Sequence, residues 1–176
     1  EAARLVHGRV LEIGTGTGYG IDVIAPCAEH FVTLDKFRSA ELGTLPANVE
    51  FCEAKVPPLP FADATFDCVV SFQVIEHIKR DRIFVDEVRR VLKPGGLFIV
   101  STPNRPMSLT RNPWHVREYT AAQFDALLSS FSEVRRMGVE GNASVWRYYE
   151  KNRASVQRIM RFDVLRMQWW LPRWLL

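Results

Sequence analysis

The fold of this chain is decided by the stretch Val10-Leu11-Glu12-Ile13-Gly14-Thr15-Gly16-Thr17-Gly18-Tyr19-Gly20. Its first four residues form a short, mainly apolar run, which predicts a buried strand. The glycines that follow at every second position allow backbone dihedrals closed to other residues and let a ligand approach the main chain. Residues 19–25 then predict a short helix whose first N–H groups face that ligand.

A second predicted strand, Phe31-Val32-Thr33-Leu34, ends on Asp35. A carboxylate at the tip of the second strand of a βαβ unit is placed to accept hydrogen bonds from the two hydroxyls of a ribose. The segment from Arg9 to Asp35 therefore predicts a nucleotide-binding unit.

The spacing of the glycines separates two kinds of nucleotide site. A dinucleotide-binding loop has the pattern Gly-x-Gly-x-x-Gly, but the sixth position is Tyr19 when counted from Gly14 and Ile21 when counted from Gly16. A nicotinamide dehydrogenase is therefore disfavoured. Glu12 followed by Gly14-x-Gly16-x-Gly18 instead resembles the first motif of class I S-adenosylmethionine (SAM)-dependent methyltransferases. The alternative is a plain glycine-rich turn between a strand and a helix.

Composition bounds the remaining possibilities. The 176 residues, of which 47% are hydrophobic and 24% charged, fit one globular domain, and a net charge of +3 does not argue for a nucleic-acid partner. Three widely spaced cysteines indicate neither a zinc site nor a disulfide framework, so a reducing, cytoplasmic setting is predicted. No signal peptide or membrane-spanning run is visible. The first residue, Glu1, already lies in an apparent helix, which is compatible with a piece of a longer protein.

Strand and helix patterns alternate through the rest of the chain. Further strands are predicted over residues 48–53, 67–72, 97–102 and 131–139, and helices over residues 37–42, 81–92 and 120–130. Thr120 and Gln123 form a capping-box pattern at the start of the last helix. This alternation predicts an α/β fold with a doubly wound, mostly parallel Rossmann-like sheet and helices on both faces. We expect a SAM-binding domain over residues 1–142 and a C-terminal helical extension, residues 143–176, packing on it.

Three more segments extend the resemblance to class I methyltransferases. They are Leu59-Pro60-Phe61-Ala62-Asp63 with Phe66-Asp67, Val74-Ile75-Glu76-His77-Ile78, and Val91-Leu92-Lys93-Pro94-Gly95-Gly96. Their order and spacing are similar to those of small-molecule methyltransferases that include the ubiquinone- and menaquinone-methylating enzymes.

The resemblance implies SAM as the cofactor, S-adenosylhomocysteine as its product, and a role for each matching position. The implied cofactor-binding residues are Glu12, Gly14, Thr15, Gly16 and Gly18 at the methionine end, Asp35 at the ribose, Ala54 and Lys55 at the adenine, and Phe72 and Gln73 at the sulfonium. Lys55 is a departure, because many relatives carry an aspartate there and a lysine cannot accept a hydrogen bond from adenine. We expect backbone around Ala54 and Lys55, or Glu53, to read the base instead.

Methyl transfer needs the two reactants to be positioned and water to be excluded, and a general base helps when the acceptor is a hydroxyl. The candidate bases are His77 and His115, although His77 also fits a structural role at a loop-to-helix transition. Some quinone-methylating relatives hold a divalent cation here with carboxylates and a histidine. Gln73 stands where one carboxylate is wanted, so no metal is predicted.

The long polar and aromatic segment 103–119 lies between the fifth strand and the next helix, and long loops in compact domains are usually functional. We assign it to the acceptor pocket, with Arg105, Trp114, His115, Arg117 and Tyr119 as substrate residues. The alternative is a loop held in place by Trp114 and Tyr119 packing in a minor core.

The C-terminal stretch from Ser144 to Leu176 is basic and aromatic. We favour a helix that caps the domain or covers the acceptor site over one that binds a membrane surface. Taken together, the sequence predicts a SAM-dependent methyltransferase acting on a small-molecule or glycan acceptor, at oxygen. The alternative is a non-catalytic SAM-binding regulatory or partner module.

Overall fold

The computed structural model describes residues 1–110, 112–139 and 141–160. Its centre is a five-stranded sheet in the order β3-β2-β1-β4-β5, and every strand pair in it is parallel. The strands are β1 (Arg9–Ile13), β2 (His30–Asp35), β3 (Val49–Glu53), β4 (Phe66–Phe72) and β5 (Leu92–Ser101). The predicted doubly wound, parallel α/β fold is confirmed.

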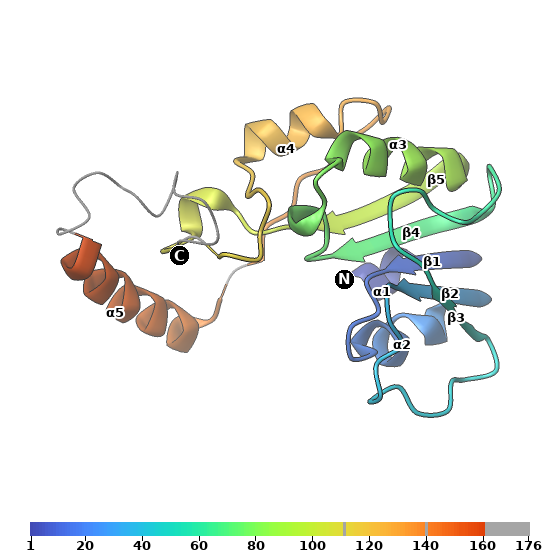
Figure 1. The fold of residues 1–176 in the computed structure, drawn as a ribbon, viewed down its shortest axis with the longest axis horizontal. Coiled ribbons are helices and arrows are strands. Elements are labelled where there is room, and N and C mark those ends of the chain that lie inside the picture. Colours follow the sequence, from blue (N-terminus) through green and yellow to red (C-terminus); the bar gives the residue numbers. More distant parts are fainter. Residues whose placement is uncertain (111, 140, 161–176) are drawn as a thin grey trace.

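Helices cover both faces of this sheet (Figure 1). The α-helices are α1 (Ala2–Leu5), α2 (Tyr19–Val23), α3 (Asp81–Val91), α4 (Ala121–Leu127) and α5 (Ala143–Met160), and short 3-10 turns are η1 (Ala25–Cys27), η2 (Ile75–His77) and η3 (Arg105–Met107). Helices α3 and α4 lie on one face, and α1 and α2 lie on the other (Figure 1). The predicted capping box at Thr120 and Gln123 is present at the start of α4.

The period of two along a strand divides the core into two layers. In β1, Leu11 and Ile13 belong to the cluster under α3, whereas Val10 belongs to the cluster under α1 and α2. Glu12 points to the same side as Val10 and is buried there, at 3% exposure. The alternation therefore delivers one carboxylate into the apolar layer beneath α2.

The order in which the chain adds strands to the sheet changes direction after β3, so β1 and β4 are the two strands that flank the switch point. From β1 the chain proceeds outward to β2 and β3, and it then returns to place β4 on the other side of β1. Such a switch point leaves a crevice outside the carboxyl ends of the two central strands, where open α/β sheets bind their ligands. Gly14 follows β1 directly, and Gln73 follows β4 directly.

Three predicted elements differ from the structure. Residues 37–42 form bends and turns instead of a helix; Phe37 is exposed, whereas Leu42 packs against the cluster under α1 and α2. Residues 131–139 form no strand and leave Val139 fully exposed, since they pair with no strand of the described sheet. Strand β5 begins earlier than predicted, at Leu92, which pairs with Phe66. The register then shifts, so that Cys68 pairs with Leu97 and the extra residues lie in β5.

The predicted helix after Gly141 is present as α5, and the Tyr149 hydroxyl donates to the carbonyl of Met107 in η3 at 3.1 Å. Residues 161–176, which carry most of the tryptophans of the C-terminal stretch, lie outside the described residues. In the part of the chain that the structure describes, no helix is long and apolar enough to cross a membrane.

Candidate cofactor and acceptor site

The glycine loop lies directly against the segment that follows β4. Gly14 has φ +98°, and a Cβ atom there would lie 2.4 Å from Cγ2 of Val74. Gly18 has φ +94°, and its Cβ would lie 2.6 Å from Cδ2 of Leu42. Both positions therefore need glycine for two reasons, the left-handed backbone and the close approach. The Gly14 N–H donates to the Leu34 carbonyl at 2.8 Å, which fixes the loop over the switch point.

Beneath the loop, Glu12 belongs to a buried polar chain. The Thr33 hydroxyl donates to Oε2 of Glu12 at 2.5 Å, and the Thr15 and Thr33 hydroxyls are 2.7 Å apart. A Cβ on Gly20 would lie 1.6 Å from Oε1 of Glu12, so the carboxylate sits against the first turn of α2. Burial raises the pKa of Glu12 to about 7, although the Thr33 hydrogen bond lowers it, and the nearby charge of Asp35 raises it further.

Asp35 is held at the edge of the same loop. Its Oδ2 accepts the N–H of Gly16 at 3.0 Å and its Oδ1 accepts the N–H of Lys36 at 2.7 Å. Asp35 is half-buried at the tip of β2, the position that the sequence predicts. The next strand ends beside it, because the Ala54 N–H donates to the Asp35 carbonyl at 2.9 Å, and Lys55 follows with its side chain exposed.

The end of β4 completes this edge of the sheet. Phe72 is 37% exposed, which is high for the last residue of an otherwise buried strand. Gln73 adopts φ +56°, an uncommon conformation for a residue other than glycine, and it is held there by two hydrogen bonds to Ser101. The residues predicted to bind the cofactor therefore gather at the carboxyl ends of β1 to β4.

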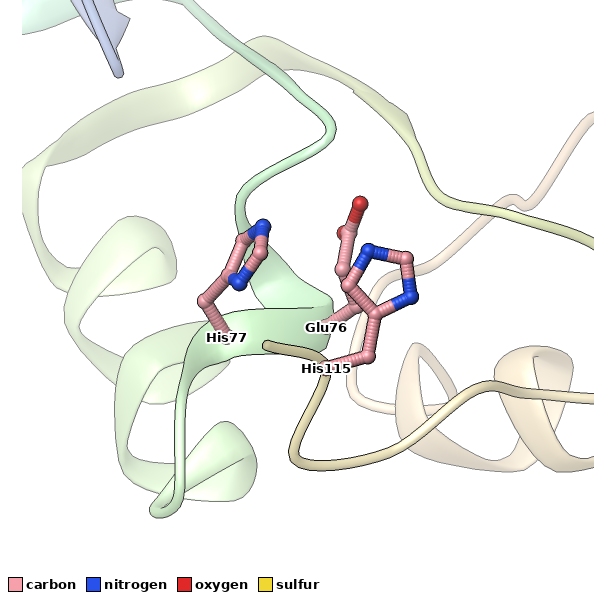
Figure 2. Close-up of side chains that lie close together, drawn as sticks. All are labelled: Glu76, His77 and His115. Atoms are coloured by element: carbon pink, nitrogen blue, oxygen red, sulfur yellow. The ribbon is translucent and has the colours of Figure 1, made fainter. Parts of the chain in front are cut away.

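The segment 103–119, which the sequence assigns to the acceptor pocket, folds back over η2. The N–H groups of Val116 and Arg117 both donate to the carbonyl of Glu76, at 2.7 and 3.2 Å. As a result the rings of His77 and His115, which are distant in sequence, lie with centroids 5.0 Å apart at 79°. Figure 2 shows these two rings and the Glu76 carboxylate facing a common space. The structure therefore brings together the two histidines that the sequence selected separately.

Each histidine is oriented through its Nδ1 atom. Nδ1 of His77 lies 3.0 Å from the Trp114 carbonyl, and Nδ1 of His115 lies 2.7 Å from Oε1 of Glu118. Both partners accept hydrogen bonds only, so each Nδ1 carries the proton and each Nε2 keeps its lone pair in the neutral ring. For His115 that lone pair faces Nδ2 of Asn112 at 3.0 Å.

Arg117 and Tyr119 engage a carboxylate that the sequence reasoning missed, Asp81 at the start of α3. The Tyr119 hydroxyl donates to Oδ2 of Asp81 at 2.9 Å, and the Arg117 guanidinium donates to the same oxygen. Tyr119 is buried, and that burial, together with the Asp81 contact, raises the pKa of its hydroxyl. These contacts fit the alternative in which the loop is held in place.

Trp114 and Arg105 are placed differently. Trp114 is 77% exposed, so the part of the alternative that packs it in a minor core is wrong. Arg105 is also exposed, and its backbone N–H donates to the Tyr119 carbonyl at 2.9 Å. Both side chains are therefore at the surface of the loop.

Glu76 and Glu118 were also missed as site residues. Glu76 is only 1% exposed; Thr102 donates to its Oε2 at 3.2 Å, while its Oε1 is buried without a hydrogen-bond partner. Oε2 of Glu118 is likewise buried without a hydrogen-bond partner. A signal for Glu76 was available in the segment Ile75-Glu76-His77, which the resemblance included, but nothing local in sequence marks Glu118 or Asp81.

The glycine spacing disfavoured a dehydrogenase, and the structure now sets that loop over the switch point of a parallel sheet, with a strand-tip carboxylate beside it. A class I, SAM-dependent methyltransferase domain is the class of protein that combines these features. The family comparison agrees: residues 11–100 match the model of the methyltransferase domain family, and the chain belongs to that family.

Known proteins extend this result. The chain is 43% identical over 139 residues to a probable S-adenosylmethionine-dependent methyltransferase of Mycolicibacterium smegmatis, covering 72% of this chain and 54% of the relative. It is 31% identical over 158 residues to the fatty-acid O-methyltransferase of the same organism, covering 86% and 53%. The solved structure of YcgJ from Bacillus subtilis has the same fold, with a TM-score of 0.62, 23% identity and coverage of 84% and 76%. The chain thus spans about half the length of the curated relatives it matches.

Proposed function

We propose that this domain transfers the methyl group of SAM to an oxygen atom of a small-molecule or glycan acceptor. The observation that carries the proposal is the close approach of Gly14 to Val74, which leaves no room for a Cβ atom and sets the glycine loop beside the segment leading to His77. A cofactor on the loop then has its methyl end near the histidine pair. The name of the fatty-acid O-methyltransferase relative supports oxygen as the atom methylated.

In this proposal the methionine end of SAM occupies the loop above Glu12, and the ribose hydroxyls bind Asp35. A positively charged amino group near Glu12 would favour the ionised carboxylate that burial alone disfavours. The adenine lies by Ala54 and Lys55, and the sulfonium lies by Phe72 and Gln73. The position of these residues at the carboxyl ends of the strands, with Lys55, Phe72 and Gln73 exposed, supports this placement.

The acceptor enters over the segment that contains His115. Trp114 and Arg105 contribute an open aromatic face and a positive charge. Arg117 and Tyr119 act indirectly, by holding the segment to Asp81. His77 and His115 activate the acceptor oxygen, either as general bases or by holding a cation that the oxygen binds.

The test is a methyl-transfer screen with radiolabelled SAM against acceptors that offer a carboxylate or hydroxyl oxygen: fatty acids, reduced quinones and glycans. We expect one class to be methylated, and His115→Ala to lower turnover by at least about tenfold with SAM affinity unchanged. His30→Ala is the matched control, because His30 begins β2 at the opposite end of the sheet. If SAM binds but no acceptor is methylated, the non-catalytic binding module replaces the proposal.

Four further predictions concern the whole protein. The division into residues 1–142 and 143–176 and the cytoplasmic setting stay predictions, and so do the absence of a nucleic-acid partner and the preference for a capping helix over membrane binding. Sedimentation with anionic liposomes tests the last of these: protein that pellets with the vesicles would revive the membrane alternative.

A further inference from the structure

We infer that Glu76, His77 and His115 form a binding site for one divalent transition-metal cation. Each of the three side chains offers a ligand atom, and these atoms all lie within 4.8 Å of one another. Figure 2 shows the three groups arriving from two segments, η2 and the loop after β5, and facing the same space. The backbone hydrogen bonds from Val116 and Arg117 to Glu76 hold these segments in register.

The buried carboxylate of Glu76 is the observation that points to a cation. Its Oε1 atom is buried and has no hydrogen-bond partner, in a side chain that is 1% exposed. A buried carboxylate oxygen without a partner is costly, and in folded proteins such charges are paired or coordinate metals. A cation between Glu76 and the two imidazoles would satisfy this oxygen directly.

The two histidines are already in the ligand form. Because Nδ1 of His77 donates to a carbonyl and Nδ1 of His115 donates to Glu118, each neutral ring keeps a lone pair on Nε2, which in His115 lies against the Asn112 amide. The contact between His115 and Glu118 is the carboxylate–histidine pairing that orients imidazoles at metal centres. Glu118 is thus a positioning residue for this site.

The donor set selects the kind of metal. Two imidazole nitrogens and one carboxylate oxygen suit Zn²⁺, Co²⁺ or Fe²⁺ better than Mg²⁺ or Ca²⁺, which prefer oxygen ligands. Bonds of roughly 2.0–2.1 Å require the ligand atoms to close to roughly 3.4 Å from one another. The amide of Asn112, now 3.0 Å from Nε2 of His115, must withdraw as they do so. His77 is exposed, so a coordination position stays open to water or to an acceptor oxygen.

This inference reverses the expectation drawn from Gln73, because His115 supplies a third ligand that the local sequence could not reveal. It also bears on the proposed function. A histidine that binds a cation through Nε2 cannot take a proton at that atom, so metal binding and a general-base role exclude each other. The binding test below uses no acceptor, and its failure is therefore distinct from failure of the methyl-transfer proposal.

The experiment is a titration of chelator-treated protein with Co²⁺, followed by visible absorption, and with Zn²⁺, followed by calorimetry. We expect one saturable site per chain and a thermal midpoint that rises with added cation. Glu76→Gln and His77→Asn should each weaken binding at least about tenfold. The exposed His77 provides a variant that keeps its fold even if the buried position does not tolerate change.

His30→Asn and His7→Asn are matched controls, since the chain has four histidines and these two lie outside the cluster. Both should bind Co²⁺ like the wild type. The inference is overturned if wild-type protein shows no saturable Co²⁺ or Zn²⁺ binding. It is also overturned if Glu76→Gln and His77→Asn bind as tightly as the wild type, or if a control variant loses the site instead.

Discussion

The proposed cofactor side and the proposed acceptor side of this site are built in different ways. On the cofactor side, the glycine loop, Glu12 and Asp35 come from one continuous βαβ unit, and their hydrogen bonds join neighbouring segments. On the acceptor side, Glu76 and Asp81 bind partners that follow β5. The cofactor side is therefore built from residues close together in the sequence, whereas the acceptor side is built from residues that are distant in the sequence.

This difference has a functional consequence. The half proposed to bind SAM depends on the backbone conformation of the glycine loop, so most substitutions there should change the affinity for SAM. The acceptor half depends on buried carboxylates and their long-range partners, so changes there should alter stability and acceptor chemistry while leaving SAM binding intact. The following predictions test that separation.

The largest effect is expected for Gly14→Ala. The new Cβ would lie 2.4 Å from Val74 and would occupy a φ of +98°. The loop must shift, so SAM affinity should fall about a thousandfold, or about 4 kcal/mol, and turnover should fall with it. Calorimetric titration measures the affinity. Gly43→Ala is the control, because no atom lies within 4 Å of its Cβ position; equal SAM affinity in Gly14→Ala and wild type would contradict the loop's role.

The next effect is expected for Glu12→Gln, with opposite signs for stability and binding. The folded-state pKa of Glu12 is about 7, above its ordinary 4.5. The folded protein therefore holds this proton more tightly, and its stability declines as pH rises from about 5 to about 8. Glutamine removes that decline, so the variant should be more stable than wild type at pH 8 by about 3 kcal/mol.

At pH 5 the two proteins should have similar stability, whereas SAM binding at pH 8 should be at least about tenfold weaker in the variant. Urea unfolding at the two pH values and calorimetry measure these quantities. Parallel pH profiles for wild type and Glu12→Gln would show that Glu12 is ionised in the fold without cost.

A smaller effect is expected for Asp81→Ala on the acceptor side. The change leaves the buried Tyr119 hydroxyl without its acceptor and releases Arg117, which should cost about 2 kcal/mol of stability. SAM affinity should stay within about twofold of wild type. Denaturant unfolding and calorimetry test this, with Asp86→Ala as an exposed control in the same helix. A loss of SAM binding as large as that of Gly14→Ala would mean that the two halves are one unit.

The same contrast explains how far the sequence could be read. The alternation of strand and helix patterns predicted a parallel sheet, and glycine spacing with the second strand predicted the position of Asp35, because each of these patterns can be recognised in a short stretch of sequence. The strand expected over residues 131–139 was wrong because its partner would have to come from elsewhere in the fold. Glu118 and Asp81 were missed for the same reason, since their roles come from contacts that no local pattern encodes.

The most direct test of the account is a calorimetric titration of SAM into wild-type protein and into Asp35→Ala. We predict one site per chain in the wild type. We also predict at least about thirtyfold weaker binding in the variant, because a carboxylate that accepts the ribose hydroxyls is lost. Wild-type protein that gives no binding heat, or a variant with unchanged affinity, would contradict the claim that SAM occupies this edge of the sheet.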